Sequence, residues 1–255
     1  MIQALLRGKL SRDQENMEDI LTSCVFGMLS YLPPDVGLIP FLSASEPVCG
    51  TAPALEGPAA QVSYRFWPQL AEQRSAAADS ADCLPCEPDV LLELRKSDGR
   101  LVYVLVEAKL WSGKSSWASE DYEAPRDQLA REWDNLARLS AREGAEPLLV
   151  YLTADFSAPL EEIRQSREEY LQKRPGGAFA CAWLSWRAIP RLFGQSDIDQ
   201  LQDLVKLCER LNLRYFTRSA RFEAAPDVTW RFRTAGPEFR WLREPVQAFQ
   251  WRYRG

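Results

Sequence analysis

The residues of this chain that can do chemistry stand at the ends of two strand-like runs joined by a tight turn. The first run starts at Asp89, and the second, residues 101–109, ends with Glu107 and Lys109. Two apolar, β-rich runs around an Asp-Gly turn are typical of an antiparallel hairpin. The second run is apolar on both faces until Glu107, which indicates a strand buried between two helical layers. Such a strand can hold two charges at its end only if they pair, reach solvent or serve a site.

The turn type decides whether these side chains meet, because residues directly opposite each other on antiparallel strands point to the same face. A three-residue loop at residues 97–99, with Gly99 left-handed, places Asp89 opposite Glu107. Lys109 shares their face because it is two residues further on. A two-residue loop would instead put Asp89 on the other face.

Two carboxylates and an ammonium that converge in this way suit a hard divalent cation, because Mg²⁺ prefers oxygen ligands and keeps waters for a substrate phosphate. The cation polarises a phosphoryl oxygen and lowers the pKa of a bound water, while the lysine orients that water or offsets charge. The 255-residue chain contains no His. This excludes Ser-His-Asp and Cys-His hydrolases, His-metal nucleases and His-ligated zinc proteases.

The motif Pro88-Asp89, followed after seventeen residues by Glu107-Ala108-Lys109, resembles the PD-(D/E)XK nuclease superfamily, whose core is helix, three strands, helix, strand. The resemblance implies that Asp89 and Glu107 are ligands of Mg²⁺ or Mn²⁺, with the backbone carbonyl of Ala108 as a further ligand. It also implies that Lys109 is the catalytic lysine. The order, strand context and spacing of the motifs carry the resemblance over roughly residues 11–155.

Many members of that superfamily add an acidic ligand from the first helix and some add a glutamine from the helix after the motif. The resemblance implies Glu18 for the first, rather than Glu15, because Glu18 lies three residues before Leu21 and seven before Val25. It implies Gln128 for the second, in contact with the water or the scissile phosphate. Both have simpler explanations, since an acid in a first helical turn is favoured by the helix dipole and a glutamine on a helix flank is usually solvated.

Simpler explanations of the main motif stay open as well. Glu107 and Lys109 could form an exposed strand end bridged to Asp89. Glu93 shares the face of Asp89 by the period of two and is a substitute ligand. Lys114 could contact phosphate from the loop after the second strand, although its Gly-Lys-Ser context lacks the upstream glycine of a P-loop.

Helices and strands alternate through most of the chain. The pattern predicts helices at residues 11–32, 125–142, 160–173 and 198–213, strands at 61–67, 89–94, 101–109, 147–153 and 178–186, and a loop at 35–60. This order indicates an α/β fold with a mixed β-sheet flanked by helices, a restriction-endonuclease-like αβββαβ core with C-terminal additions. We expect residues 1–213 to form the nuclease-like domain and residues 214–255 an extension packed on it.

Charge is distributed unevenly along the chain. Residues 210–255 contain ten Arg, no Lys and four acidic residues, a net +6, so the first 209 residues carry −11 of the total of −5. The same stretch holds ten aromatic residues. Arginine interleaved with aromatics suits contact with phosphates and bases, although amphipathic strands with inward aromatics explain it equally simply and are favoured here. The negative net charge is unfavourable for a protein that binds DNA without a partner, because nonspecific affinity comes from neutralising the phosphates.

The cysteines and the apolar runs indicate in which cellular compartment the protein is expected. The six Cys are scattered, which indicates free thiols in a reducing compartment. Cys83 and Cys86 have zinc-like spacing, but a structural zinc site would need two distant cysteines, and we do not expect one. No apolar run reaches the roughly 18 residues of a membrane span, and the first ten residues do not resemble a secretory signal. We therefore expect a cytoplasmic protein with no membrane contact.

The sequence thus predicts a Mg²⁺-dependent nuclease that cuts nucleic acid, DNA rather than RNA, by in-line attack of water. By family analogy it is a defence effector whose targeting comes from a homodimer or a partner subunit. The competing hypotheses are a catalytically silent scaffold or nucleic-acid-binding module with the same fold, and an RNA nuclease. The intact set of Asp89, Glu107 and Lys109 argues against a silent site.

Overall fold

The computed structural model describes residues 18–55, 57, 59–70, 84–112, 114 and 124–214. The chain divides into two units, residues 1–215 and 216–255. The second unit lies outside the described residues, so the packing of the Arg- and aromatic-rich extension stays a prediction. Within the described ranges, no helix is both long and apolar enough to cross a membrane.

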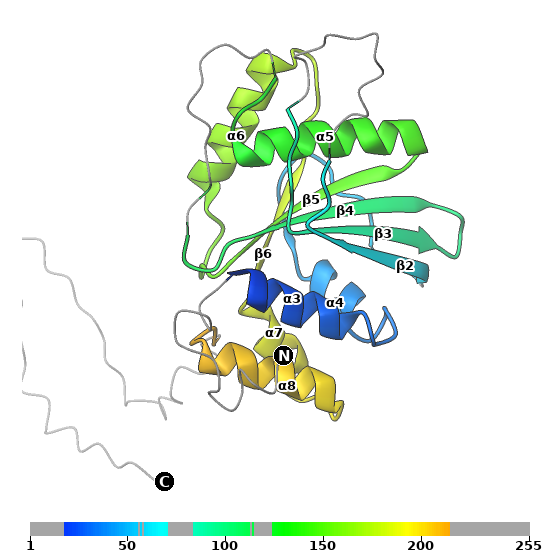
Figure 1. Cartoon of the computed structure of the whole chain (residues 1–255), viewed down its shortest axis with the longest axis vertical. Helices are drawn as coiled ribbons and strands as arrows, with labels where there is room; N and C mark the ends of the chain where they lie inside the picture. Colours follow the sequence, from blue (N-terminus) through cyan, green and yellow to red (C-terminus); the bar gives the residue numbers. More distant parts are fainter. Residues whose placement is uncertain are drawn as a thin grey trace, which may run out of the picture. The chain divides into compact units, whose positions relative to one another are not determined.

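A mixed sheet of six strands forms the centre of the described part (Figure 1). The strands are β1 (Glu46–Cys49), β2 (Ala59–Phe66), β3 (Val90–Lys96), β4 (Leu101–Ala108), β5 (Glu146–Thr153) and β6 (Cys181–Ser185), and their order across the sheet is β1-β6-β5-β4-β3-β2. Strands β4, β5 and β6 are parallel, and the other neighbouring pairs are antiparallel. The predicted α/β fold with a mixed sheet is confirmed.

Helices cover both faces of this sheet (Figure 1). One face carries α3 (Glu18–Leu29), α4 (Leu38–Ser43), α7 (Ala188–Phe193) and α8 (Asp199–Arg210), and the other carries α5 (Gln128–Glu143) and α6 (Leu160–Lys173). Two apolar clusters, one on each side of the sheet, hold the layers together.

The central strand β4 alternates between these two clusters. Val104 and Val106 belong to the cluster under α3 and α8, whereas Leu105 belongs to the cluster under α5. Because side chains alternate along a strand, Glu107 and then Lys109 continue the α5 side beyond the apolar part of the strand. The predicted burial of β4 on both faces is therefore confirmed, and its charged end lies under α5.

The hairpin of β3 and β4 has the three-residue loop. The Lys96 N–H donates to the Arg100 carbonyl at 2.8 Å, and Gly99 has a φ of +91°. Val90 pairs with Val106 in the resulting register. One residue further out, this register puts position 89 opposite position 107, as the three-residue loop predicts.

The conformation of Gly99 allows a direct test of the hairpin. We expect Gly99→Ala to lower the free energy of unfolding by about 1 kcal/mol, because a left-handed φ strains any residue with a Cβ. Gly27→Ala, inside α3, has no atom within 4 Å of the added Cβ and is expected to stabilise by up to about 1 kcal/mol. Urea unfolding of both variants measures the difference, and equal effects of the two would contradict it.

The prediction of a loop over residues 35–60 is wrong. The short helix α4 buries Leu38, Phe41 and Leu42, and β1 pairs with β6 at the edge of the sheet. The partner of β1 comes some 135 residues later in the chain, so no local pattern reveals the strand. The last helix, Asp199–Arg210, and the last strand, Cys181–Ser185, are shorter than predicted, and the first helix ends at Leu29. Residues 11–17, predicted to begin the first helix, lie outside the described residues.

Candidate active site

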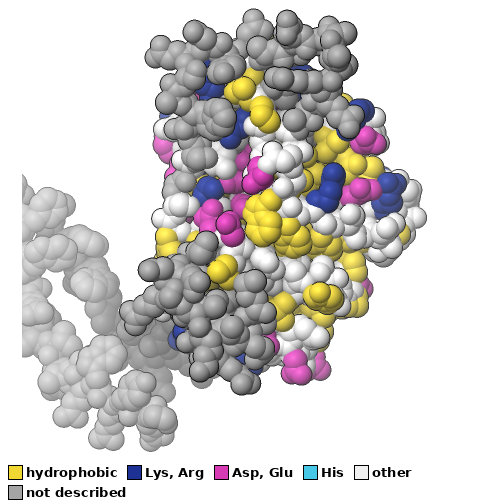
Figure 2. Space-filling view, viewed as in Figure 1, with side chains coloured by type: hydrophobic (Ala, Val, Ile, Leu, Met, Phe, Trp, Pro, Cys, Tyr) yellow, Lys and Arg dark blue, Asp and Glu magenta, His cyan; other side chains and the backbone are white. Residues whose placement is uncertain are grey.

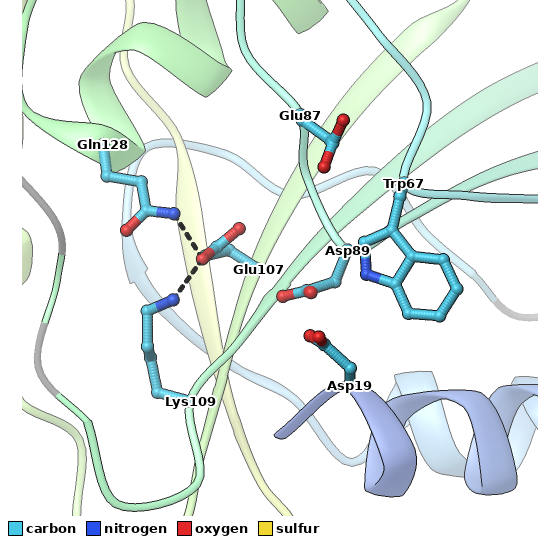
Figure 3. A pocket seen from close by; sticks show the side chains of 7 residues that line it. All are labelled: Asp19, Trp67, Glu87, Asp89, Glu107, Lys109 and Gln128. Carbon is cyan, nitrogen blue, oxygen red and sulfur yellow. Dashed lines mark hydrogen bonds and ion pairs between the residues drawn. The ribbon is translucent and has the colours of Figure 1, made fainter. Parts of the chain in front are cut away.

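A pocket of about 450 Å³ opens where β2 and β4 end and β3 begins, between α3 and the start of α5 (Figure 3). Its lining side chains are Asp19, Trp67, Glu87, Asp89, Glu107, Lys109 and Gln128. Four of them are carboxylic acids and one is an ammonium. The pocket therefore has the composition of a cation site, and it brings together four of the predicted site residues, Asp89, Glu107, Lys109 and Gln128.

Asp89 lies immediately before β3 and is held through both backbone and side chain. Its carbonyl accepts from the Trp67 N–H at 2.9 Å, and its Oδ2 accepts from the Ala108 N–H at 2.8 Å. Burial, and then the charge of Glu107, raise the pKa of Asp89 to about 7, and the Ala108 N–H and Lys109 offset only part of this effect. A cation next to Asp89 would remove this penalty, because it favours the ionised form.

Glu107 is the most deeply buried carboxylate of the pocket, at 2 % exposure. Its Oε1 accepts hydrogen bonds from Lys109 Nζ and Gln128 Nε2, both at 2.5 Å (Figure 3). Gln128 is the first residue of α5, and Asp127 caps this helix by accepting from the Ala130 N–H at 3.1 Å. The cap thus sets the position from which Gln128 reaches Glu107.

Lys109 is buried among carboxylates. Its Nζ lies 2.5 Å from Glu107 Oε1 and 3.3 Å from Glu18 Oε1. Burial lowers the pKa of Lys109, but the charges of Glu107, Glu18 and Asp89, with the hydrogen bond to Glu107, outweigh it and raise the pKa above its usual value. The side chain is therefore a fixed cation that points into the pocket.

The acidic residue that α3 presents to the pocket is Asp19, whereas the predicted residue was Glu18. Glu18 does not line the pocket, because its Oε2 accepts from the Leu110 N–H at 2.7 Å and from the Ser112 hydroxyl at 2.8 Å. Successive helical residues point about 100° apart, so Glu18 is directed to the residues that follow β4 while Asp19 is directed into the pocket. Glu15 lies outside the described residues.

Glu132 is a buried acid that sequence reasoning missed. It lies one helical turn after Gln128 on α5, is 1 % exposed, and shares a hydrogen bond with Glu107. Its Oε2 has no hydrogen-bond partner among the described residues. Burial, and then the charge of Glu107, raise the pKa of Glu132 well above its usual value. The spacing of four from Gln128 is the signal that would have found it.

We expect Glu132→Gln to be more stable than the wild type at high pH. A buried acid with a raised pKa contributes stability that is present below its unfolded value of 4.5 and is lost as pH rises. Glutamine keeps the shape and a donor for Glu107 without that loss. Urea unfolding at pH 5 and pH 9 should show a gap that widens with pH, and a gap that narrows would contradict the assignment. Glu132→Ala should be destabilised at both pH values.

Two further predicted residues lie elsewhere. Glu93 is bound to Arg95, and its four-residue separation from Asp89 along the strand corresponds to roughly 13 Å, so it is no substitute ligand. Lys114 binds Asp127 Oδ2 at 2.6 Å and Ser166 Oγ at 2.8 Å. Lys114 is thereby bound to α6 and to the residue that caps α5, and it does not line the pocket.

The donor set fits a hard cation, although it does not form a closed cage. Among the residues that the structure describes, no three Cys, Asp or Glu side chains lie close enough together to hold a metal ion as they stand. The strand register puts Asp89 opposite Glu107, and Asp19 and Glu87 line the same pocket. Ala108, the predicted backbone ligand, here gives its N–H to Asp89. Such an open set matches Mg²⁺, which usually takes one or two carboxylates and keeps its waters.

The cysteines provide no alternative metal site in the described part. Cys24, Cys49, Cys181 and Cys208 are free thiols. Burial raises the pKa of both Cys181 and Cys208, so these thiols are inert. Cys83 lies outside the described residues, so the low expectation for a zinc site at Cys83 and Cys86 stays a prediction.

Trp67 was also missed by sequence reasoning. It follows β2, lines the pocket beside Asp89 and has a φ of +45° (Figure 3). A left-handed φ costs a bulky residue on the order of 1–3 kcal/mol. The hydrogen bond from its N–H to the Asp89 carbonyl holds this conformation. Glu87, the other unpredicted lining residue, is bound to Gln69.

Comparisons with known proteins add little to this geometry. No family model matches the chain, and no curated protein matches it. One solved structure, of Pyrococcus furiosus SfsA in complex with Ca²⁺, matches with 18 % sequence identity over 48 % of this chain and 47 % of that chain, at a TM-score of 0.22. The match spans about half of each chain.

Proposed function

We propose that this protein is a metal-dependent phosphodiesterase of the PD-(D/E)XK kind that hydrolyses nucleic acid. The observation that carries the proposal is the convergence of Asp89, Glu107 and Lys109 in one pocket at the carboxyl end of β4. Gln128 joins them from α5 through its hydrogen bond to Glu107.

Each residue has a role that its position supports. Asp89 and Glu107 would hold Mg²⁺, which when bound polarises a phosphoryl oxygen and lowers the pKa of water. Lys109 is a fixed cation beside them, placed to orient the attacking water and to offset charge that develops on the phosphate. Gln128 would steady Glu107 and reach the same water. The remaining acids keep anions out of the pocket until a cation is present.

The simpler explanation, an exposed strand end, fits these residues poorly. Glu107 is 2 % exposed and Lys109 is 8 % exposed. Burying several ionisable groups costs free energy, and a strand end with a purely structural role would avoid this cost by leaving them exposed to solvent. The hydrogen bond that Asp89 makes here is to the backbone, because its Oδ2 accepts from the Ala108 N–H.

The proposal extends to the polymer and the partner. We infer DNA rather than RNA as the substrate. Because the pocket itself is acidic, we infer that residues 214–255 or a partner subunit supply the affinity for phosphate. A role in defence against foreign DNA stays a prediction from the family resemblance.

The test is cleavage of single- and double-stranded DNA and RNA with Mg²⁺ or Mn²⁺, with and without a chelator. The expected result is metal-dependent cleavage that the chelator stops. Cleavage of RNA alone would show that the substrate is RNA rather than DNA. No cleavage of any substrate, together with no effect of Mg²⁺ on the melting temperature, would favour the silent scaffold.

A further inference from the structure

Three exposed aromatic side chains follow strands whose carboxyl ends lie at the end of the sheet that holds the pocket. Strands β2, β4, β5 and β6 all point the same way, so their carboxyl ends lie at one edge. Trp67 follows β2, Trp111 follows β4 and Phe156 follows β5, at exposures of 37 %, 61 % and 61 %. Among the described residues only one other large aromatic, Tyr31, is this exposed. Figure 2 shows acidic side chains next to an apolar area near the middle of the visible face.

Trp67 is the member of this group that lines the pocket itself (Figure 3). Its ring packs at 5.7 Å between centroids against Phe66, which packs on the core, so the indole has a firm support. Its left-handed backbone is tied to the Asp89 carbonyl. The hydrogen bond to the Asp89 carbonyl therefore holds Trp67 next to Asp89 in a strained backbone conformation, and such strain is typical of functional sites.

The acidity of the pocket explains why an aromatic platform is needed there. Four carboxylates repel a phosphodiester, and among the described residues Lys109 is the one basic side chain of the lining. Even with one divalent cation bound, the attraction for phosphate is modest. A nucleobase stacked on an indole adds affinity that does not depend on charge or on base identity.

We propose that Trp67 stacks on the base of a nucleotide next to the scissile phosphate, so that the site takes a strand unpaired at the point of cleavage. This inference rests on the proposed function and names its substrate class. Bases in a duplex offer only their edges in the grooves, whereas unpaired bases offer their faces. Phe156, covered on one side by the Arg187 guanidinium at 3.7 Å, is a second platform further along the same edge.

The test measures binding by fluorescence anisotropy, with Ca²⁺ in place of Mg²⁺. The probes are a labelled oligodeoxythymidine of roughly 12 nucleotides, an abasic strand of the same length, and a duplex of that length. The wild type is expected to bind the oligodeoxythymidine at least tenfold more tightly than the abasic strand and the duplex. Equal or tighter binding of the abasic strand or of the duplex would overturn the inference without any variant.

Variants assign the preference to Trp67. Trp67→Leu, which keeps an apolar side chain without a π-face, should lose the preference for bases, and Trp67→Phe should retain most of it. Tyr31→Leu is the matched control, because Tyr31 is an exposed aromatic two residues beyond the C-terminal end of α3, roughly 18 Å from Asp19 by helical rise. A preference that survives in Trp67→Leu, or disappears in Tyr31→Leu, overturns the inference.

The outcome separates this inference from the proposed function. Mg²⁺-dependent cleavage by the wild type with no preference for bases would leave the proposed function standing and remove the role of Trp67. A preference for bases that depends on Trp67, without cleavage under any metal, would support the stacking of an unpaired base on Trp67 and contradict the nuclease. Binding of neither strand and no cleavage would overturn both.

Discussion

Replacing Lys109 by methionine is expected to lower Mg²⁺-dependent cleavage by at least about a hundredfold, the size of effect seen when one electrostatic stabiliser of a transition state is removed. Methionine keeps the apolar stem and removes the ammonium that now lies 2.5 Å from Glu107 Oε1. The measurement is the single-turnover rate with enzyme in excess, because this rate separates the chemical step from substrate binding.

Loss of the buried ion pair also affects folding, so the comparison needs controls. Lys109→Met should melt at a lower temperature because Glu107 loses its charged partner, and rates are therefore compared below the melting temperature of both proteins. Lys206→Met removes an exposed lysine of α8, which pairs with Asp203 at 3.4 Å, and should cleave as the wild type does. Cleavage by Lys109→Met within threefold of the wild type would rule out the proposed role.

Replacing Asp89 by asparagine is expected to abolish cleavage and yet to stabilise the metal-free protein above neutral pH. Asparagine retains an oxygen for the Ala108 N–H and removes the charge that faces Glu107. The folded pKa of about 7 is raised above the usual 3.8, so the contribution of Asp89 to stability is present below pH 4 and is lost as pH rises through 7. Three pKa units correspond to at most about 4 kcal/mol.

Two thermal measurements follow from this variant. Without metal, the melting temperature of Asp89→Asn should exceed that of the wild type at pH 8 by several degrees, with no such gain at pH 4. With Mg²⁺ at pH 8, the wild type should gain stability and the variant should not, because it lacks one of the proposed ligands.

The control comes from the same hairpin. Hydrogen bonds from Arg100 lower the pKa of Asp98, so its contribution has the opposite sign and appears as pH rises above the unfolded value. Asp98→Asn should therefore lose stability at pH 8 and respond to Mg²⁺ as the wild type does. An Asp89→Asn protein that Mg²⁺ stabilises equally would exclude Asp89 as a ligand.

Local pattern was sufficient for the central part of the fold. The β3–β4 hairpin and the burial of β4 on both faces follow from strand period and turn chemistry. The sequence left a two-residue and a three-residue loop open, and the structure has the three-residue loop with a left-handed Gly99. The helix that carries Gln128 follows from its apolar stripe and from Gly144 at its end. Contacts between neighbours in the sequence fix these features, so the sequence shows them directly.

The remaining features depend on residues far apart in the chain. Strand β1 exists only because β6 pairs with it, and a four-residue run has no pattern of its own. Asp19 replaces Glu18 in the pocket because the Leu110 N–H and Ser112 engage Glu18, and no helical period could foresee those partners.

The roles of Glu132 and Trp67 also depend on residues far apart in the chain. Glu132 is read from the sequence as one more charged residue of a helix, and only the packing of α5 over β4 buries it against Glu107. Trp67 is one aromatic residue at a strand end, and only the pairing of β2 with β3 brings it to Asp89. Residue types and local spacing could thus nominate the motif at Asp89, Glu107 and Lys109. Its surroundings were decided by the tertiary structure, because burial and hydrogen-bond partners are properties of the packed chain.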